Sequence, residues 1–265
     1  MLFFCRCLLV VGALWTMNCH ALAWGTIGHQ VVGAIAERHL TSAARERIAA
    51  ILATEGKKSL VQVANWADHV RRLTIPVQPS HVVLMPFGAK EYVPDRDCPE
   101  KQCVVAAIGA NIRALSDPKL PDPAKMVALK YLVHFVGDIH QPLHTIRASR
   151  LHKAWDTDII RQQNAKWKRL AGRVDAEESD PRERASIADW AWESHQLAKE
   201  IVRDAKHLRR EDGSYALNVV YYQANWPIVE RRLKAAGMRL AWALNDIFAP
   251  SEEASTSEST EALTE

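Results

Sequence analysis

Apolar residues recur at helical spacing along most of this chain. From Ile27 to Leu40 they fall three or four residues apart, which predicts an amphipathic helix. The same pattern predicts helices over residues 41–52, 59–73, 104–115, 124–140, 151–170, 182–208 and 216–248, with Pro227 as a candidate break in the last. Residues 80–84 and 216–220 resemble strands, and both runs are short. The pattern therefore predicts one all-α domain without internal repeats.

The first 23 residues have the pattern of a secretory signal. Arg6 precedes an apolar run from Leu8 to Met17, and residues 21–23 read Ala-Leu-Ala, the small-residue pattern of a cleavage site. The apolar run is too short to span a bilayer. Cleavage after residue 23 would leave Trp24 as the first residue. A free α-amine has a pKa of about 7.7–8, so it can release its proton to a cation near neutral pH.

Charge and cysteine content separate the domain from its two ends. Residues 250–265 hold five acidic residues and no basic or aromatic one, which predicts a disordered acidic tail. Residues 24–249 carry 33 basic and 26 acidic residues, and this balance of +7 favours a polyanionic partner. No other apolar segment reaches membrane-spanning length, so we expect a soluble mature protein that is secreted or periplasmic.

Two cysteines remain once the leader is removed. Cys98 and Cys103 enclose four residues, and in an oxidising compartment a local disulfide is the natural interpretation. A metal site with two cysteine ligands is the alternative, although no histidine lies nearby in the sequence.

Histidine and aspartate residues recur at spacings that suit a metal centre. His134 and Asp138 lie four residues apart in the predicted helix 124–140, so both project from one face. His152 and Asp156 repeat this spacing, and His144 lies between the two pairs. One such pair is more often a hydrogen-bonded pair on a helix surface. Two copies joined by a third histidine indicate metal binding, since neutral imidazole and ionised carboxylate are ligands that zinc accepts.

Further candidate ligands lie upstream of these pairs. Asp68 follows Trp-Ala in the predicted helix 59–73, and His81 follows Pro-Ser. His29 lies five residues after Trp24, so the amine and carbonyl of Trp24 could share an ion with this imidazole. Alone, His29 or His81 would indicate only an ordinary helix or loop residue.

Taken together, the motifs resemble the S1/P1 family of trinuclear zinc nucleases and, more distantly, bacterial zinc-dependent phospholipase C. The matching segments are Trp24-Gly-x-x-Gly-His29, Trp66-Ala-Asp68, His81, His134-Phe-Val-Gly-Asp138-x-x-Gln-Pro-Leu-His144 and Leu151-His152-x-x-Trp155-Asp156-Thr157, with similarity continuing to Asn245. The resemblance implies a single compact all-α domain of many helices over residues 24–249. It also implies a short irregular loop closed by a disulfide between Cys98 and Cys103.

The resemblance also assigns ligands for three zinc ions. It implies Asp68, His81, His134 and Asp138 for the first, the Trp24 amine and carbonyl, His29 and Asp138 for the second, and His144, His152 and Asp156 for the third. Asp68 would also orient the attacking water, and Arg71 would offset charge on the phosphoryl oxygens. Such a centre suits phosphodiester hydrolysis.

The activity implied is that of a secreted endonuclease that hydrolyses single-stranded DNA or RNA to 5′-phosphate products and removes 3′ phosphates, without stable membrane association. Two departures favour an alternative. First, only residues 145–151 separate His144 from His152, where the family has a longer loop that helps to bind the base. Second, Val82 and Leu84 stand where the family has an aromatic residue and a polar residue. A phospholipase C-like hydrolase would tolerate these more apolar residues beside the metal centre, because its substrate carries acyl chains. A non-catalytic extracytoplasmic zinc-binding protein is a second alternative, against which Arg71 argues.

Overall fold

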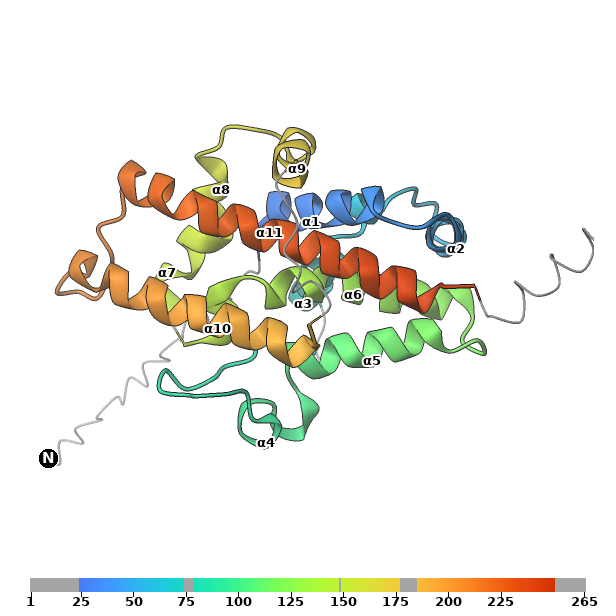
Figure 1. Cartoon of the computed structure of the whole chain (residues 1–265), viewed down its shortest axis with the longest axis horizontal. Helices are drawn as coiled ribbons and strands as arrows, with labels where there is room; N and C mark the ends of the chain where they lie inside the picture. Colours follow the sequence, from blue (N-terminus) through green and yellow to red (C-terminus); the bar gives the residue numbers. More distant parts are fainter. Residues whose placement is uncertain (1–23, 74–78, 148, 177–184, 251–265) are drawn as a thin grey trace, which may run out of the picture.

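The computed structural model describes residues 24–73, 79–147, 149–176 and 185–250 (Figure 1). The predicted signal (1–23) and residues 251–265 of the predicted acidic tail lie outside this part. Within it, the regular elements are all helical, and the single β feature is an isolated bridge between Arg209 and Tyr215. The predicted all-α fold is confirmed, and neither strand-like run forms a strand.

The elements follow one another in a simple order. The α-helices are α1 (Thr26–Arg38), α2 (Ser42–Ala53), α3 (Trp66–Leu73), α4 (Pro94–Asp97), α5 (Val104–Ser116), α6 (Asp122–Ile139), α7 (Ser149–Lys153), α8 (Ile159–Arg161), α9 (Trp167–Asp175), α10 (Ile187–Asp204) and α11 (Val219–Ile247). Between them lie 3₁₀ turns η1 (Leu60–Gln62), η2 (Pro99–Lys101), η3 (Pro142–Thr145) and η6 (Ala205–Leu208), and η4 (Ala154–Asp158) is a turn of π-helix.

Two of the predicted helices are divided in the structure. Residues 59–73 form η1 and α3 with a turn over residues 63–65 between them, and in this turn the carbonyl of Ala64 accepts a hydrogen bond from His134 Nδ1 at 2.7 Å. Residues 151–170 are divided after α8, where Asn164 adopts a left-handed conformation with φ of 43° that a helix does not accommodate. In contrast, α11 runs without interruption through Pro227.

Helix α6 is the central helix of the domain and packs against α1, α2, α3, α5 and α11 (Figure 1). Its apolar residues are buried on several faces, and Leu129, Leu132 and Phe135 are fully buried. A helix that is apolar almost all round must lie inside the protein. The last two turns of this buried helix therefore place His134 and Asp138 at the centre of the molecule.

Side chains from α10 and α11 hold the C-terminal end of α6. Arg232 Nε donates to the carbonyl of His140 at 3.2 Å, and Ser194 Oγ donates to the carbonyl of Ile139 at 2.5 Å. The last carbonyls of a helix have no partner within the helix and need one from elsewhere when they are buried. These contacts fix the end of the helix that carries Asp138.

The disulfide between Cys98 and Cys103 is present, with an S–S distance of 2.01 Å, which confirms the predicted pairing. The loop around it contains α4 and η2, which apolar periodicity did not predict because each is a single turn that begins with a proline, Pro94 and Pro99. Among the described residues, no helix is both long and apolar enough to cross a membrane.

Replacing Glu193 by Gln should destabilise the domain. Glu193 accepts from Arg239 Nη1 at 2.7 Å and pairs with Arg232 at 3.1 Å, and both guanidinium groups are buried. Removing one partner of a buried pair leaves an uncompensated charge. Since Glu193 is partly exposed, we expect a loss of about 2 kcal/mol in the free energy of unfolding, measured by urea denaturation with zinc present. Glu200→Gln, at an exposed position on the same helix, is the control. Equal midpoints for the two variants would contradict the prediction.

Candidate metal centre

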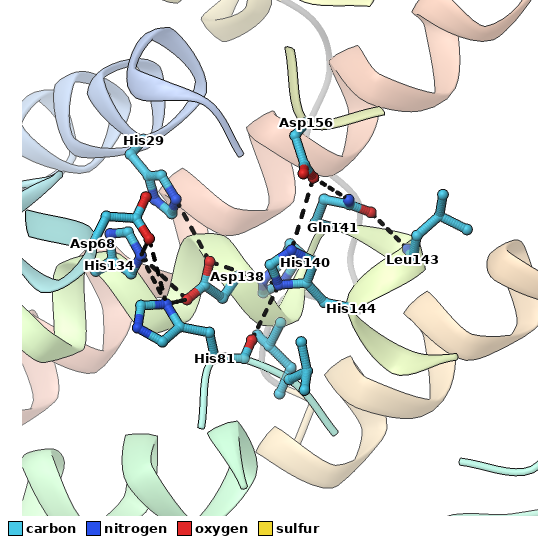
Figure 2. Close-up of polar contacts among 12 residues, drawn as sticks. His29, Asp68, His81, His134, Asp138, His140, Gln141, Leu143, His144 and Asp156 are labelled. Atoms are coloured by element: carbon cyan, nitrogen blue, oxygen red, sulfur yellow. Dashed lines mark hydrogen bonds and ion pairs between the residues drawn. The ribbon is translucent and has the colours of Figure 1, made fainter. Parts of the chain in front are cut away.

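The structure brings the eight histidine and aspartate side chains predicted as ligands into one site. Figure 2 labels all of them except His152. They come from seven segments: His29 from α1, Asp68 from α3, His81 from the chain before α4, His134 and Asp138 from α6, His144 from η3, His152 from α7 and Asp156 from η4. Each of the eight residues is less than 10% exposed. Residues distant in the sequence therefore meet in a space nearly closed to water.

The carboxylate of Asp138 lies at the middle of this site (Figure 2). Its Oδ2 is 2.9 Å from His81 Nδ1 and 3.3 Å from His134 Nε2. Its Oδ1 is 3.5 Å from His29 Nε2 and 3.7 Å from His144 Nδ1. Oδ2 thus faces His81 and His134 whereas Oδ1 faces His29, and this division suits a carboxylate that bridges two cations.

Three groups of side chains have ligand atoms within 4.8 Å of one another. The groups are Asp68 with His81 and His134, His29 with His134 and Asp138, and His144 with His152 and Asp156. The third has the composition expected from the sequence. In the first two, His134 contributes to both, because its ring stacks on that of His29 with centroids 3.9 Å apart.

The donor atoms fit a metal ion better than they fit each other. Several of them are fully buried without a hydrogen-bond partner in the described part of the chain, namely both ring nitrogens of His29, Nε2 of His81, His144 and His152, Oδ1 of Asp68 and both oxygens of Asp138. A buried polar atom left unsatisfied costs about 1–3 kcal/mol. Cations placed among these nitrogens and oxygens would satisfy them.

Hydrogen bonds behind the site fix the orientation of the imidazole rings. His134 Nδ1 donates to the carbonyl of Ala64, and His144 Nδ1 donates to the carbonyl of His81 at 3.0 Å. In each ring the proton on Nδ1 leaves Nε2 with a lone pair directed into the site. Both histidines are therefore oriented as ligands.

Gln141 supports Asp156, a role that the sequence analysis did not assign. Its Nε2 donates to Asp156 Oδ1, and its Oε1 accepts from the backbone N–H of Leu143 at 2.6 Å (Figure 2). The backbone contact fixes the amide so that its NH₂ group points at the carboxylate. The signal available in the sequence was the glutamine immediately before Pro142, at the break after the helix.

Burial sets the protonation of the site. It lowers the pKa of His29 and His144 well below the usual value, and it lowers the pKa of His81 and His152 to about 4, with the charge of Arg71 acting in the same direction on the last two. These imidazoles are neutral at neutral pH, the form that binds metal. Burial also raises the pKa of Asp138 and of Asp156, so their ionised forms need a nearby cation.

Two glycines allow parts of the site to approach closely. A Cβ on Gly137, inside α6, would lie 2.6 Å from His29 Nδ1, and a Cβ on Gly28 would lie 2.8 Å from the Cβ of Trp24. Both distances are shorter than a carbon atom tolerates. The glycines within Trp24-Gly-x-x-Gly-His29 and His134-x-x-Gly-Asp138 are therefore needed for packing between motifs.

Trp24 and Arg71 also lie at this site. Trp24 is fully buried, and the next residue ties the segment to the site because Gly25 N donates to the backbone carbonyl of Asp156 at 2.7 Å. Arg71 is half-buried on α3, three residues after Asp68, and its charge acts on Asp138 as well as on the histidines. A cation on this face can meet an anionic substrate.

Comparison with known proteins identifies the family. A model of the S1/P1 nuclease family matches residues 24–249. The chain belongs to the S1/P1 nuclease family. Endonuclease 4 of Arabidopsis thaliana is 30% identical over 86% of this chain and 90% of its own length, and Endonuclease 2 of the same plant is 28% identical over 85% and 90%. Nuclease P1 of Penicillium citrinum is 30% identical over 46% of this chain and 47% of its own.

Membership of the S1/P1 nuclease family fixes the class of reaction. The protein is a hydrolase of phosphodiester bonds in nucleic acids, and S1/P1 nucleases depend on zinc. The clusters of buried histidine and aspartate side chains are able to bind that metal.

Replacing Gly137 by Ala should weaken metal binding. The added methyl group would displace the His29 ring from α6, so we expect zinc affinity at this part of the site to fall by at least about tenfold, measured by competition with a chelator. Gly109→Ala, inside α5, is the matched control, since its Cβ would lie 3.4 Å from the end of the flexible Arg113 side chain. The control should gain about 0.5 kcal/mol of stability. Equal zinc affinity in both variants would rule out the packing argument.

Proposed function

We propose that this protein is a secreted endonuclease that hydrolyses single-stranded DNA or RNA through a three-zinc centre. It leaves 5′-phosphate ends and also removes 3′ phosphates from nucleotides. The observation that carries this proposal is the position of Asp138, whose two oxygens face different groups of buried imidazoles. One bridging carboxylate between adjacent groups supports a pair of cations, and the His144 group supports a third.

The ligands follow from the groups in the structure and from the family motifs. The proposed sets are Asp68, His81, His134 and Asp138 for the first ion, Trp24, His29 and Asp138 for the second, and His144, His152 and Asp156 for the third. Trp24 would contribute its amine and carbonyl after removal of residues 1–23. Its burial, and the bond from Gly25 to the carbonyl of Asp156, support this assignment.

Asp68 and Arg71 have different roles in the proposed reaction. When bound, the zinc ions activate water and stabilise charge on the phosphoryl and leaving oxygens. Asp68 places a buried oxygen, Oδ1, in the site, where it can orient the attacking water. Arg71 neutralises negative charge that develops on the phosphoryl oxygens. Because the site is nearly closed to water, these electrostatic interactions are only weakly screened.

The burial of the centre also supports a single-stranded substrate. Each of the eight ligands on side chains is less than 10% exposed, so the scissile phosphodiester must enter the protein surface to reach them. A flexible strand with splayed bases can do so, whereas a duplex keeps its backbone on the outside of a wide and stiff rod. The basic balance of residues 24–249 favours the same polyanion.

Secretion is supported by two independent features. The leader-like residues 1–23 would direct export, and the disulfide between Cys98 and Cys103 forms and persists in oxidising compartments. A periplasmic or extracellular location also accounts for a mature chain that starts at Trp24.

A zinc-dependent phospholipase C-like activity is the second candidate. The chain that follows His81 exposes Leu84 and Phe87, which are 37% and 45% exposed, and an apolar surface beside the site would suit acyl chains. Family membership favours nucleic acid over lipid.

The purified protein should lose hydrolysis of denatured DNA on treatment with EDTA and regain it with zinc. The reason is that several buried nitrogen and oxygen atoms of the site have no hydrogen-bond partner in the described part of the chain, and a zinc ion would bind them. The measurement pairs zinc content per molecule with turnover of denatured DNA, of RNA and of phosphatidylcholine micelles. Turnover of lipid alone would establish the second candidate, and full activity in EDTA would exclude a metal-dependent mechanism.

Replacing Arg71 by Ala should lower kcat on single-stranded DNA by about 100-fold, because it removes a cation that stabilises the developing phosphoryl charge. Zinc content should stay the same, since Arg71 is not a ligand. Arg113→Ala, at an exposed position on α5, is the control and should change neither quantity. Unchanged turnover in Arg71→Ala would show that the assigned role is wrong.

A further inference from the structure

The segment that follows the proposed ligand His81 lies directly beside a second part of the centre. Val83 N donates to the carbonyl of His144 at 2.9 Å, and Met85 N donates to the carbonyl of Thr145 at 3.0 Å. Residues 82–89 therefore start at one proposed ligand and run alongside another. Val83, Met85 and Ala89 of this segment are buried, whereas the side chains of Leu84 and Phe87 are exposed at the surface.

Helix α10 supports this segment through one face (Figure 1). His195, Lys199 and Arg203 lie four residues apart, so they share a face of the helix. His195 Nδ1 donates to the carbonyl of Thr145 at 3.1 Å, and Lys199 Nζ donates to the carbonyl of Ala89 at 3.4 Å. The guanidinium of Arg203 lies over the ring of Phe87, 5.7 Å from its centroid.

The same face carries a second pairing of a ring with a cation. Lys199 Nζ lies 5.4 Å from the ring centroid of Trp192, which is half-buried. Phe87 is 45% exposed, although burial of its ring in the core would be more favourable. We name these four residues, Phe87, Arg203, Trp192 and Lys199, the aromatic–cation stripe.

We propose that the aromatic–cation stripe binds unpaired nucleotides of the substrate strand that lie beyond the scissile bond. The inference rests on the proposed nuclease function and adds to it a substrate site outside the metal centre. Flat rings accept any base by stacking, and adjacent cations hold the phosphates between bases. The stripe pairs each of its two rings with a cation, and this combination of aromatic and basic side chains suits sequence-tolerant binding of a single strand.

The stripe is close enough to the centre to act on the same strand. Phe87 lies six residues after His81, so their Cα atoms are at most about 20 Å apart. The exposed side chain of Leu84 lies between them in the sequence, and residues 82–89 contain no acidic residue. A strand of several nucleotides can therefore contact the metal centre and the stripe together, whereas a dinucleotide occupies the centre alone.

Substrate length provides the test. For the zinc-loaded full-length enzyme, kcat/KM is measured on a dinucleotide and on a single-stranded oligonucleotide of twelve or more bases. Phe87→Ala should lower the ratio of the long-strand value to the dinucleotide value by roughly tenfold, the size expected for loss of one stacked base. Phe87→Trp, which keeps an aromatic ring, should retain most of the wild-type ratio.

Salt dependence gives a second readout for the cation. Arg203→Gln should lower the same ratio, and it should reduce the slope of log kcat/KM against log salt on the long strand by about 0.7, the value for one phosphate contact to a single strand. The matched controls are Val127→Ala, an exposed apolar residue on α6, and Lys57→Gln, an exposed cation after α2. Neither should change the ratio or the slope.

Three outcomes separate the possibilities. A ratio that Phe87→Ala leaves unchanged would overturn the stripe as a substrate site. An equal loss on the long strand and the dinucleotide would also overturn it, because Phe87 would then only support the segment that carries His81. If the wild-type enzyme hydrolyses neither substrate, the proposed function itself fails, and the stripe fails with it.

Discussion

Burial of ionisable side chains around a single carboxylate is the constraint on which this structure depends. Asp138 and the imidazoles that face it are removed from water, where each would otherwise find hydrogen bonds. Their proximity satisfies them only in part, because a neutral imidazole has a single N–H to donate and several nitrogens and carboxylate oxygens of the site have no hydrogen-bond partner in the described part of the chain. Cations would satisfy these atoms, so we expect folding and metal binding to stabilise each other.

The surrounding helices hold the metal-binding side chains in place. Helix α6 brings His134 and Asp138 to the centre, and partners from α10 and α11 fix the carbonyl groups at its end. Outer hydrogen bonds to backbone carbonyls orient the rings of His134 and His144. Precision at the site thus comes from contacts with neighbouring helices, since the donors are supplied by segments that are far apart in the chain.

The sequence was sufficient for the fold class and for naming the residues that meet at the site. Apolar residues recur at helical spacing in α1, α5 and α6 because these helices pack in the core, and the His134-x-x-x-Asp138 pair lies on α6. Periodicity failed at residues 59–73, where a turn divides the predicted helix and the carbonyl of Ala64 in that turn accepts from His134, a residue distant in the sequence. It also gave no sign of the single-turn helices in the disulfide loop.

Contacts between segments that are distant in the sequence could not be predicted from the sequence either. Gln141 could be seen beside Pro142, but its bond to Asp156 requires the positions of two separate elements. Likewise, Phe87 reads as an ordinary apolar loop residue until α10 places Arg203 over its ring.

The π-helical turn η4 has a consequence for how this site can change. Such a turn contains one more residue than an α-helical turn for a similar rise. Deleting one residue from it would convert this stretch into a regular α-helical turn. The segment just beyond the turn contacts α1 through Ile160, whose Cδ1 packs close to Gly28, next to His29. This turn both carries Asp156 and adjoins the contact with α1, so a change in its length would act on two parts of the site at once.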